Sequence, residues 1–194
     1  MRHIYLDVKA FGPVGAGDPF AFAAARFDAS GCHRDAAAQR AWSVAMGPTT
    51  RIDVETLGWL ASQAPQVLAQ LSDPIPFATA WYDFLAWAVP ELGGPHAPPP
   101  IVFWADDWAD FAWLSIAARS SGVPELRAFG VQADATALLL ASGVTAPTPA
   151  AEHTPHVAAD DVRQGVAHLL RAVTALGVSL DRMILAPSRG ETTT

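Results

Sequence analysis

The sequence predicts an α/β fold in which antiparallel hairpins lead into the parallel part of one mixed sheet. Residues 3–8 alternate in polarity, and residues 20–27 form an apolar segment that ends in a turn; both are typical of strands. Further along, residues 101–105 are wholly apolar, as in a buried parallel strand. Segments with helical spacing separate the later strands. This mixture of strand-like alternation and helical spacing favours a layered sheet flanked by helices.

The first half of the chain predicts a three-stranded antiparallel meander followed by helices. The strands are expected at about residues 3–8, 20–27 and 41–46, with a loop rich in glycine and proline between the first two. Helical spacing then begins after Asp53 and continues to Leu68. A longer helix is expected from about residue 77 to residue 89, after Asp73-Pro74.

The second half predicts strands and helices in alternation. Residues 91–100 contain four prolines and two glycines and are expected to form a loop within the domain. The elements expected after it are a strand at 101–105, a helix at 107–120, a strand at 126–131, a helix at 134–141, a loop at 145–155 and a helix at 157–175. Residues 178–185 are either a last strand or an edge packing segment. We expect one domain over residues 1–187 and a polar tail at 188–194.

Composition excludes several classes of protein. With 51% hydrophobic and 16% charged residues, the chain is neither disordered nor a membrane protein with a long apolar run, and no secretory signal is evident, so a cytoplasmic location is expected. The single cysteine excludes an internal disulfide and a multi-cysteine metal site. A net charge of −7 argues against a broad cationic surface for nucleic acid. All 12 basic residues are arginine except Lys9.

Three aspartates occupy unusual positions. Asp7 lies in an otherwise apolar strand, where a buried carboxylate needs a cation or a donor; the alternative is that it points into solvent. Asp110 lies in the first turn of a predicted helix, where the bland explanation is interaction with the helix dipole. Asp161 follows His156 by five positions at the start of the last helix, as any acidic first turn would.

Taken together, these segments and their order resemble the DEDDh branch of the DnaQ-like 3′–5′ exonucleases. That family has an Asp-x-Glu pair on the first strand, an Asp in a helix after the fourth strand, and His-x-x-x-x-Asp at the last helix. Here Asp7-Val8-Lys9 stands at the first motif, Asp110 at the second, and His156 and Asp161 keep the third spacing. The chain looks most similar to the phage exonuclease A group and the mycobacterial exoribonuclease-like domain, which also have a helical phrase like residues 56–63.

The resemblance, which spans roughly residues 3–176, implies an RNase H-like fold and two Mg²⁺ or Mn²⁺ ions about 4 Å apart. It implies that Asp7 bridges both metals and that Asp110 and Asp161 each complete one coordination sphere. His156 would be the general base for the attacking water. The implied partner is single-stranded or 3′-overhang nucleic acid, and Trp108 is the best candidate among the tryptophans for stacking on a terminal base.

Lys9 departs from the family pattern, because it stands where the resemblance calls for a metal-binding glutamate. An ammonium cannot ligate a hard cation and changes the local charge by two units. Either Lys9 inactivates the site, with its ammonium among Asp7, Asp110 and Asp161 in place of the metal, or activity survives with one metal or with another acid. Candidates for that acid are Asp106, Asp107 and Asp18.

Three functions therefore compete. The first is a 3′–5′ exonuclease or exoribonuclease, weakened or inactivated by Lys9. The second is a catalytically dead pseudo-exonuclease that binds nucleic-acid ends or proteins. The third is an unrelated α/β domain whose acids coincide. The sequence lacks the P-loop, HExxH and GxSxG motifs, and it leaves DNA or RNA, and monomer or homodimer, undecided.

Overall fold

The computed structural model describes residues 2–32, 36–89 and 101–180. The strands are β1 (Arg2–Ala10), β2 (Pro19–Asp28), β3 (Gly31–Cys32), β4 (Gln39–Ser43), β5 (Ile101–Ala105) and β6 (Val131–Asp134). The α-helices are α1 (Val54–Ala61), α2 (Pro65–Leu68), α3 (Phe77–Ala88), α4 (Trp108–Ser120), α5 (Ala135–Ser142) and α6 (Ala158–Leu176). Within these ranges, no helix is long and apolar enough to cross a membrane.

One mixed sheet organises the molecule, as the sequence predicts. Its strands follow the order β3-β2-β1-β5-β6, and β4 also pairs with β2. Strand β1 is central: it is antiparallel to β2 and parallel to β5, and β5 is parallel to β6. The predicted meander and the predicted parallel part are therefore both present and meet at β1.

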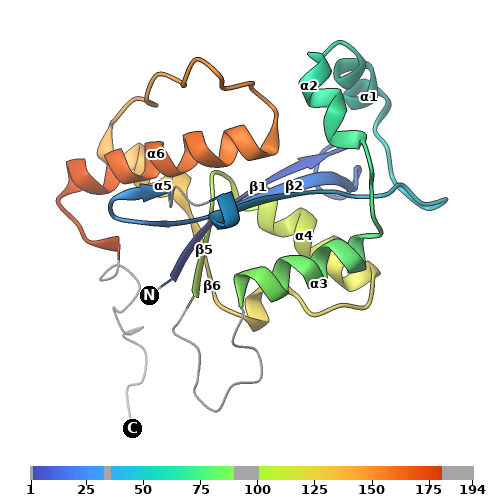
Figure 1. Ribbon diagram of the computed structural model, residues 1–194, viewed down its shortest axis with the longest axis horizontal. Helices are drawn as coiled ribbons and strands as arrows, with labels where there is room; N and C mark the ends of the chain where they lie inside the picture. The colour runs from blue at the N-terminus through green and yellow to red at the C-terminus, as the bar shows by residue number, and fades with distance from the viewer. Residues whose placement is uncertain (1, 33–35, 90–100, 181–194) are drawn as a thin grey trace, which may run out of the picture.

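Helices cover both faces of this sheet (Figure 1). Helices α3 and α4 pack on one face, in a core with Ile4, Leu6 and Val8 of β1. Helices α5 and α6 pack on the other, in a core with Tyr5 of β1. Helices α1 and α2 lie beyond the end of the sheet, where Leu60 and Val67 pack in a third, smaller cluster.

The alternation of β1 decides which of its side chains can meet α6. Successive side chains in a strand point to opposite faces of the sheet. Asp7 and Lys9 are in step with Tyr5, which packs against α6, whereas Leu6 and Val8 face α3 and α4. The sheet therefore presents Asp7 and Lys9 to the face that α6 covers.

Two predicted strands are displaced. The strand predicted at 41–46 begins two residues earlier and ends three residues earlier, since β4 runs from Gln39 to Ser43. After it, Val44 forms an isolated bridge to Ile75. The predicted strand 126–131 is wrong in most of its length: Leu126–Ala128 is a 3₁₀ helix whose Leu126 is buried in the α3 and α4 core, and β6 begins only at Val131.

Gly130 explains where β6 can begin. A Cβ atom at this position would lie 2.4 Å from the carbonyl oxygen of Ile101, so only glycine lets the chain approach β5 here. The predicted loop 91–100, most of the segment 178–185 and the tail 188–194 lie outside the described residues.

Gly165 of α6 offers a test of the packing between α6 and β1. A Cβ atom there would lie 2.5 Å from the buried ring of Tyr5, so Gly165→Ala should lower the free energy of unfolding by about 1–3 kcal/mol through overpacking. Gly58→Ala is the matched control, because α1 leaves open space there; it should raise stability by about 0.5–1 kcal/mol. Urea denaturation measures both. Equal stabilisation by the two substitutions would contradict the described contact.

Candidate functional site

Lys9 and Asp7 form the centre of a charged cluster on the α6 face of the sheet. The ammonium nitrogen Nζ of Lys9 donates to Oδ1 of Asp7 at 2.9 Å and lies 2.8 Å from Oδ2 of the same carboxylate. Only 16% of the Lys9 side chain and 14% of the Asp7 side chain are exposed. The alternative of a solvated, outward-pointing Asp7 is therefore wrong.

Asp161 joins the cluster from the first turn of α6, where an acidic side chain suits the helix dipole. Its Oδ2 lies 2.7 Å from Nζ of Lys9, so one ammonium bridges carboxylates from the central strand and from the last helix. The same oxygen accepts the backbone N–H of His156 at 3.0 Å. The other oxygen lies 3.4 Å from Nε2 of His153.

Asp110 is buried in the first turn of α4, with 6% of the residue exposed. Its Oδ1 accepts the backbone N–H of Val8 at 2.9 Å, so the side chain reaches β1 between Asp7 and Lys9. The helix-start carboxylate exposed to solvent is instead Asp107, which caps α4 by accepting the N–H of Ala109. The explanation of Asp110 as a simple dipole partner therefore fails, and the residue belongs to the cluster.

Burial dominates the electrostatics of the cluster. It raises the pKa of Asp7 to about 6, although the neighbouring ammonium of Lys9 acts in the opposite direction. It raises the pKa of Asp110 to about 8, with a further contribution from the negative charge of Asp7. Burial alone would lower the pKa of Lys9, but Asp7 and Asp161 together raise it above its usual value. These shifts keep Lys9 charged at neutral pH and favour the protonated form of Asp110.

The two histidines ahead of α6 take different positions. The ring of His156, the expected general base, is exposed and lies edge-on to Trp59 with ring centroids 5.0 Å apart. Only the backbone N–H of His156 reaches Asp161. Sequence analysis missed His153, which is three residues earlier and places its imidazole against Asp161. In the sequence, the only indication of a role for His153 was that two histidines stand close to the start of one helix.

The backbone of His156 is held in a left-handed conformation, with φ of +68°. Such a conformation is strained for a residue other than glycine and needs support from its surroundings. Gln70 supplies it: its Nε2 donates to the carbonyl of His156, and its Oε1 accepts the N–H of Ala158, both at 2.8 Å. Together with Asp161, this amide fixes the turn that directs the two imidazoles apart.

A further carboxylate, Asp106, stands beside the cluster at the end of β5. The hydroxyl of the buried Tyr5 donates to Oδ1 of Asp106, and the hydroxyl of Thr136 donates to its backbone carbonyl. The charge of Asp106 contributes to the raised pKa values of Asp7 and Asp110. Asp18 lies elsewhere, in an ion pair with Arg51.

Two tryptophans near the cluster are exposed. Trp108, the expected stacking residue, begins α4 two positions before Asp110 and is 54% exposed, with its ring against Phe111. Trp59 is 43% exposed beside His156. By contrast, Trp81 and Trp104 are buried in the two main cores.

The residues present do not fit a two-metal centre. The Lys9 ammonium lies between Oδ2 of Asp7 and Oδ2 of Asp161, in contact with both oxygens. A divalent cation held by these two carboxylates would need the same space. An ammonium supplies no lone pair for a hard cation, so Lys9 cannot replace a carboxylate ligand there. Across the described ranges, no three or more histidine, cysteine, aspartate or glutamate side chains are arranged to hold a metal ion.

Comparison with known proteins identifies the fold. No protein-family model and no curated protein sequence matches the chain. Among solved structures, cell-death related nuclease 4 (CRN-4) aligns at 13% identity with a TM-score of 0.54, over 91% of this chain and 64% of that one. SSB/Exonuclease I in complex with the inhibitor CFAM aligns at 12% identity with a TM-score of 0.60, over 94% and 42%.

A third structure, Pop2p from S. pombe in its Mg²⁺- and Mn²⁺-bound form, aligns at 11% identity with a TM-score of 0.55, over 89% of this chain and 82% of that one. These likenesses confirm the RNase H-like fold. The chain spans less than two thirds of the length of the first two structures. The molecule therefore has an RNase H-like fold in which Lys9 bridges the carboxylates of Asp7 and Asp161.

Asp110 predicts a specific dependence of stability on pH. Its pKa is about 8 in the folded protein and 3.8 without perturbation, so between these values the folded chain keeps a proton that the unfolded chain loses. The protonated Asp110 side chain therefore stabilises the folded chain fully below pH 4, and this stabilisation declines as the pH rises towards 8. Asp110→Asn cannot ionise and can still accept the Val8 N–H. It should exceed wild type in unfolding free energy by about 2 kcal/mol or more near pH 8.

Urea denaturation across this pH range measures the effect. The two proteins should converge near pH 4. Asp107→Asn, at the exposed cap of the same helix, should keep the wild-type slope because Asn is also a good cap. Parallel curves for wild type and Asp110→Asn would show that Asp110 is ionised in the folded state.

Proposed function

We propose that this chain is a pseudo-exonuclease, a protein of exonuclease ancestry that binds nucleic-acid ends and has lost, or almost lost, two-metal hydrolysis. One observation carries the proposal: the Lys9 ammonium bridges Asp7 and Asp161 at 2.8 and 2.7 Å. These are two of the three carboxylates that the resemblance assigns to the metals. Lys9 supplies a fixed positive charge there but no ligand for Mg²⁺ or Mn²⁺.

The charge balance of the cluster supports binding without cleavage. At neutral pH the Lys9 ammonium offsets one of the two carboxylates that it contacts, and the uncharged form of Asp110 is favoured. A phosphate backbone near the cluster therefore meets less repulsion than it would without the Lys9 charge, although Asp106 adds negative charge beside the cluster. The charge balance reduces, without removing, the repulsion that a terminal phosphate has to overcome.

Exposed aromatic rings supply contacts for an unpaired end. Trp108 stands at the start of the helix that carries Asp110, and Trp59 stands beside His156. Stacking of a base on such a ring is worth about 1–3 kcal/mol and tolerates any sequence. The proposed partner is accordingly a single strand or a 3′ overhang. The wider proposal includes kinship with the phage exonuclease A group and a cytoplasmic location.

A second function, weak metal-dependent exonuclease activity, is favoured by Asp106. This carboxylate is held by Tyr5 and lies close enough to influence both Asp7 and Asp110. If Lys9 turned away, Asp106 could take the role of the missing glutamate. Hydrolysis would then depend on Asp106 as well as on Asp7, Asp110 and Asp161.

Restoring the carboxylate at position 9 tests the proposal. Wild type should bind a labelled single-stranded oligonucleotide and leave it intact in Mn²⁺, whereas Lys9→Glu should shorten it from the 3′ end. Lys9→Met is the matched control, because it removes the ammonium without adding a ligand, and it should remain inactive. Gel analysis of the products distinguishes the variants.

If the chain is instead a weak metal-dependent exonuclease, wild type should shorten the oligonucleotide in this assay. Degradation by wild type that is abolished by Asp106→Asn would replace the pseudo-exonuclease with an active enzyme. Failure of wild type to bind any oligonucleotide, DNA or RNA, would reject nucleic acid as the partner.

Trp108 is predicted to contribute to binding. Trp108→Ala should weaken oligonucleotide affinity by about 5-fold to 100-fold, which corresponds to the loss of one stacked base. Tyr82→Ala is the control, because Tyr82 is an equally exposed aromatic residue on α3 (55% exposed). Fluorescence anisotropy measures both affinities. An equal loss in the two variants would show that the effect of Trp108 is not local stacking.

A further inference from the structure

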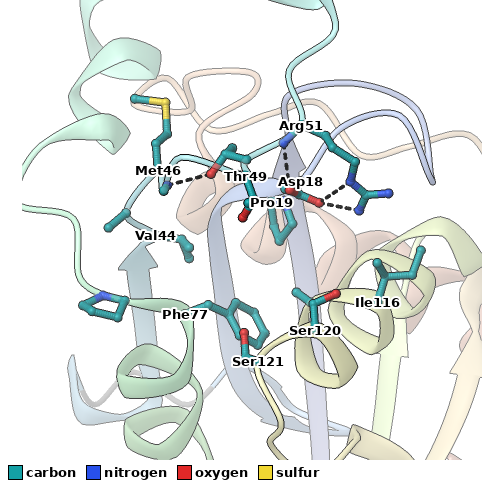
Figure 2. Close-up of a pocket in the computed structure, with 15 residues that line it drawn as sticks. Asp18, Pro19, Val44, Met46, Thr49, Arg51, Phe77, Ile116, Ser120 and Ser121 are labelled. Atoms are coloured by element: carbon teal, nitrogen blue, oxygen red, sulfur yellow. Dashed lines mark hydrogen bonds and ion pairs between the residues drawn. The ribbon is translucent and has the colours of Figure 1, made fainter.

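A cavity of about 570 Å³ lies between the start of β2, the chain that follows β4, the start of α3 and the end of α4 (Figure 2). This volume is in the range of small-molecule sites in proteins. Figure 2 shows Phe77, Ser120 and Ser121 along one side, with Thr49, Asp18 and Arg51 across from them.

The cavity is separate from the Lys9 cluster. Phe77 belongs to the core on the α3 and α4 face of the sheet, and Ile116 and Ser120 come from the last turns of α4. Lys9 and Asp7 face α6 on the opposite side. A ligand in this cavity would therefore not be in contact with the carboxylate cluster, and the sheet would lie between them.

The lining of the cavity is electrically neutral. Among the described residues that line it, only Asp18 and Arg51 are charged, and they neutralise each other. Nε of Arg51 donates to Oδ1 of Asp18 at 3.0 Å, and its Nη2 contacts the same oxygen. Nη1 of Arg51 donates to the carbonyl of Gly15 at 2.8 Å. All three guanidinium nitrogens are thus engaged, so the cavity offers little attraction to an anion.

The uncharged lining combines apolar surface with hydroxyl groups. The ring of Phe77 is stacked on Trp81 at 5.5 Å, which holds it in place, and Val44 and Pro19 are also buried at the cavity. Ser120 and Ser121 add hydroxyls at the mouth. A hydroxyl can donate and accept, and an immobilised aromatic ring favours a flat partner.

We propose that this cavity is a binding site for a neutral heteroaromatic molecule of nucleoside size, with its ring against the Phe77 side and its polar edge on the serine hydroxyls. Because the lining is neutral, the ligand does not need a phosphate group in order to bind. The proposal is independent of the pseudo-exonuclease function, because it concerns the opposite face of the sheet.

Adenosine and uridine are the probes, measured by calorimetry on the full chain. At least one should bind wild type, and Ser120→Phe and Ser121→Phe, both at exposed positions of the mouth, should each weaken binding at least about tenfold by filling the cavity. Ser62→Phe, at the exposed end of α1, should bind as wild type does. Adenosine monophosphate should bind about tenfold more weakly than adenosine, because its charge finds no free cation.

Several results would overturn the proposal: no binding of either nucleoside, unchanged binding in both mouth variants, or tighter binding of the monophosphate. Displacement of the nucleoside by a saturating single-stranded oligonucleotide would also overturn it, by placing the nucleoside in the Lys9 site. If the chain binds no oligonucleotide at all, the pseudo-exonuclease proposal fails while the nucleoside titrations still decide this one. Circular dichroism of each variant checks that it is folded.

Discussion

The arrangement of the site depends on one half-buried ammonium, that of Lys9, held between the carboxylates of Asp7 and Asp161. This ion pair joins the central strand of the sheet to the helix that covers it. Removing one partner of a fully buried pair commonly costs about 3–5 kcal/mol, because a charge is left without compensation, and this half-buried pair should contribute less. Lys9 therefore has a structural role wherever Asp7 and Asp161 are ionised, and its position on the strand determines what chemistry the cluster can support.

The rest of the fold serves to bring these groups together. Strand alternation places Asp7 and Lys9 on the α6 face, while the first turn of α4 brings Asp110 to the backbone of Val8. The turn before α6, clamped by Gln70, sets Asp161 at the ammonium. Because the side chain at position 9 is an ammonium, these carboxylates form a salt-bridged cluster. The cavity proposed for a nucleoside lies on the side of the sheet that α3 and α4 cover.

Much of this could be predicted from the sequence, because periodicity and motif order are local properties. The strands around Asp7 and the helix after residue 105 were predicted from the pattern of polarity, and the structure places Lys9 between Asp7 and Asp161. The orientation of His156 could not be predicted, since it depends on a left-handed residue held by Gln70 from a distant segment. The 3₁₀ turn at Leu126 was missed for a similar reason: burial against α3 and α4 outweighed its strand-like composition.

The most direct test of the central claim is a crystal structure of the wild-type chain grown with Mn²⁺ and measured at an anomalous wavelength. The account predicts no manganese among Asp7, Asp110 and Asp161, with Nζ of Lys9 within salt-bridge distance of Asp7 and Asp161. Two manganese peaks among these carboxylates, with Lys9 turned away from them, would contradict it.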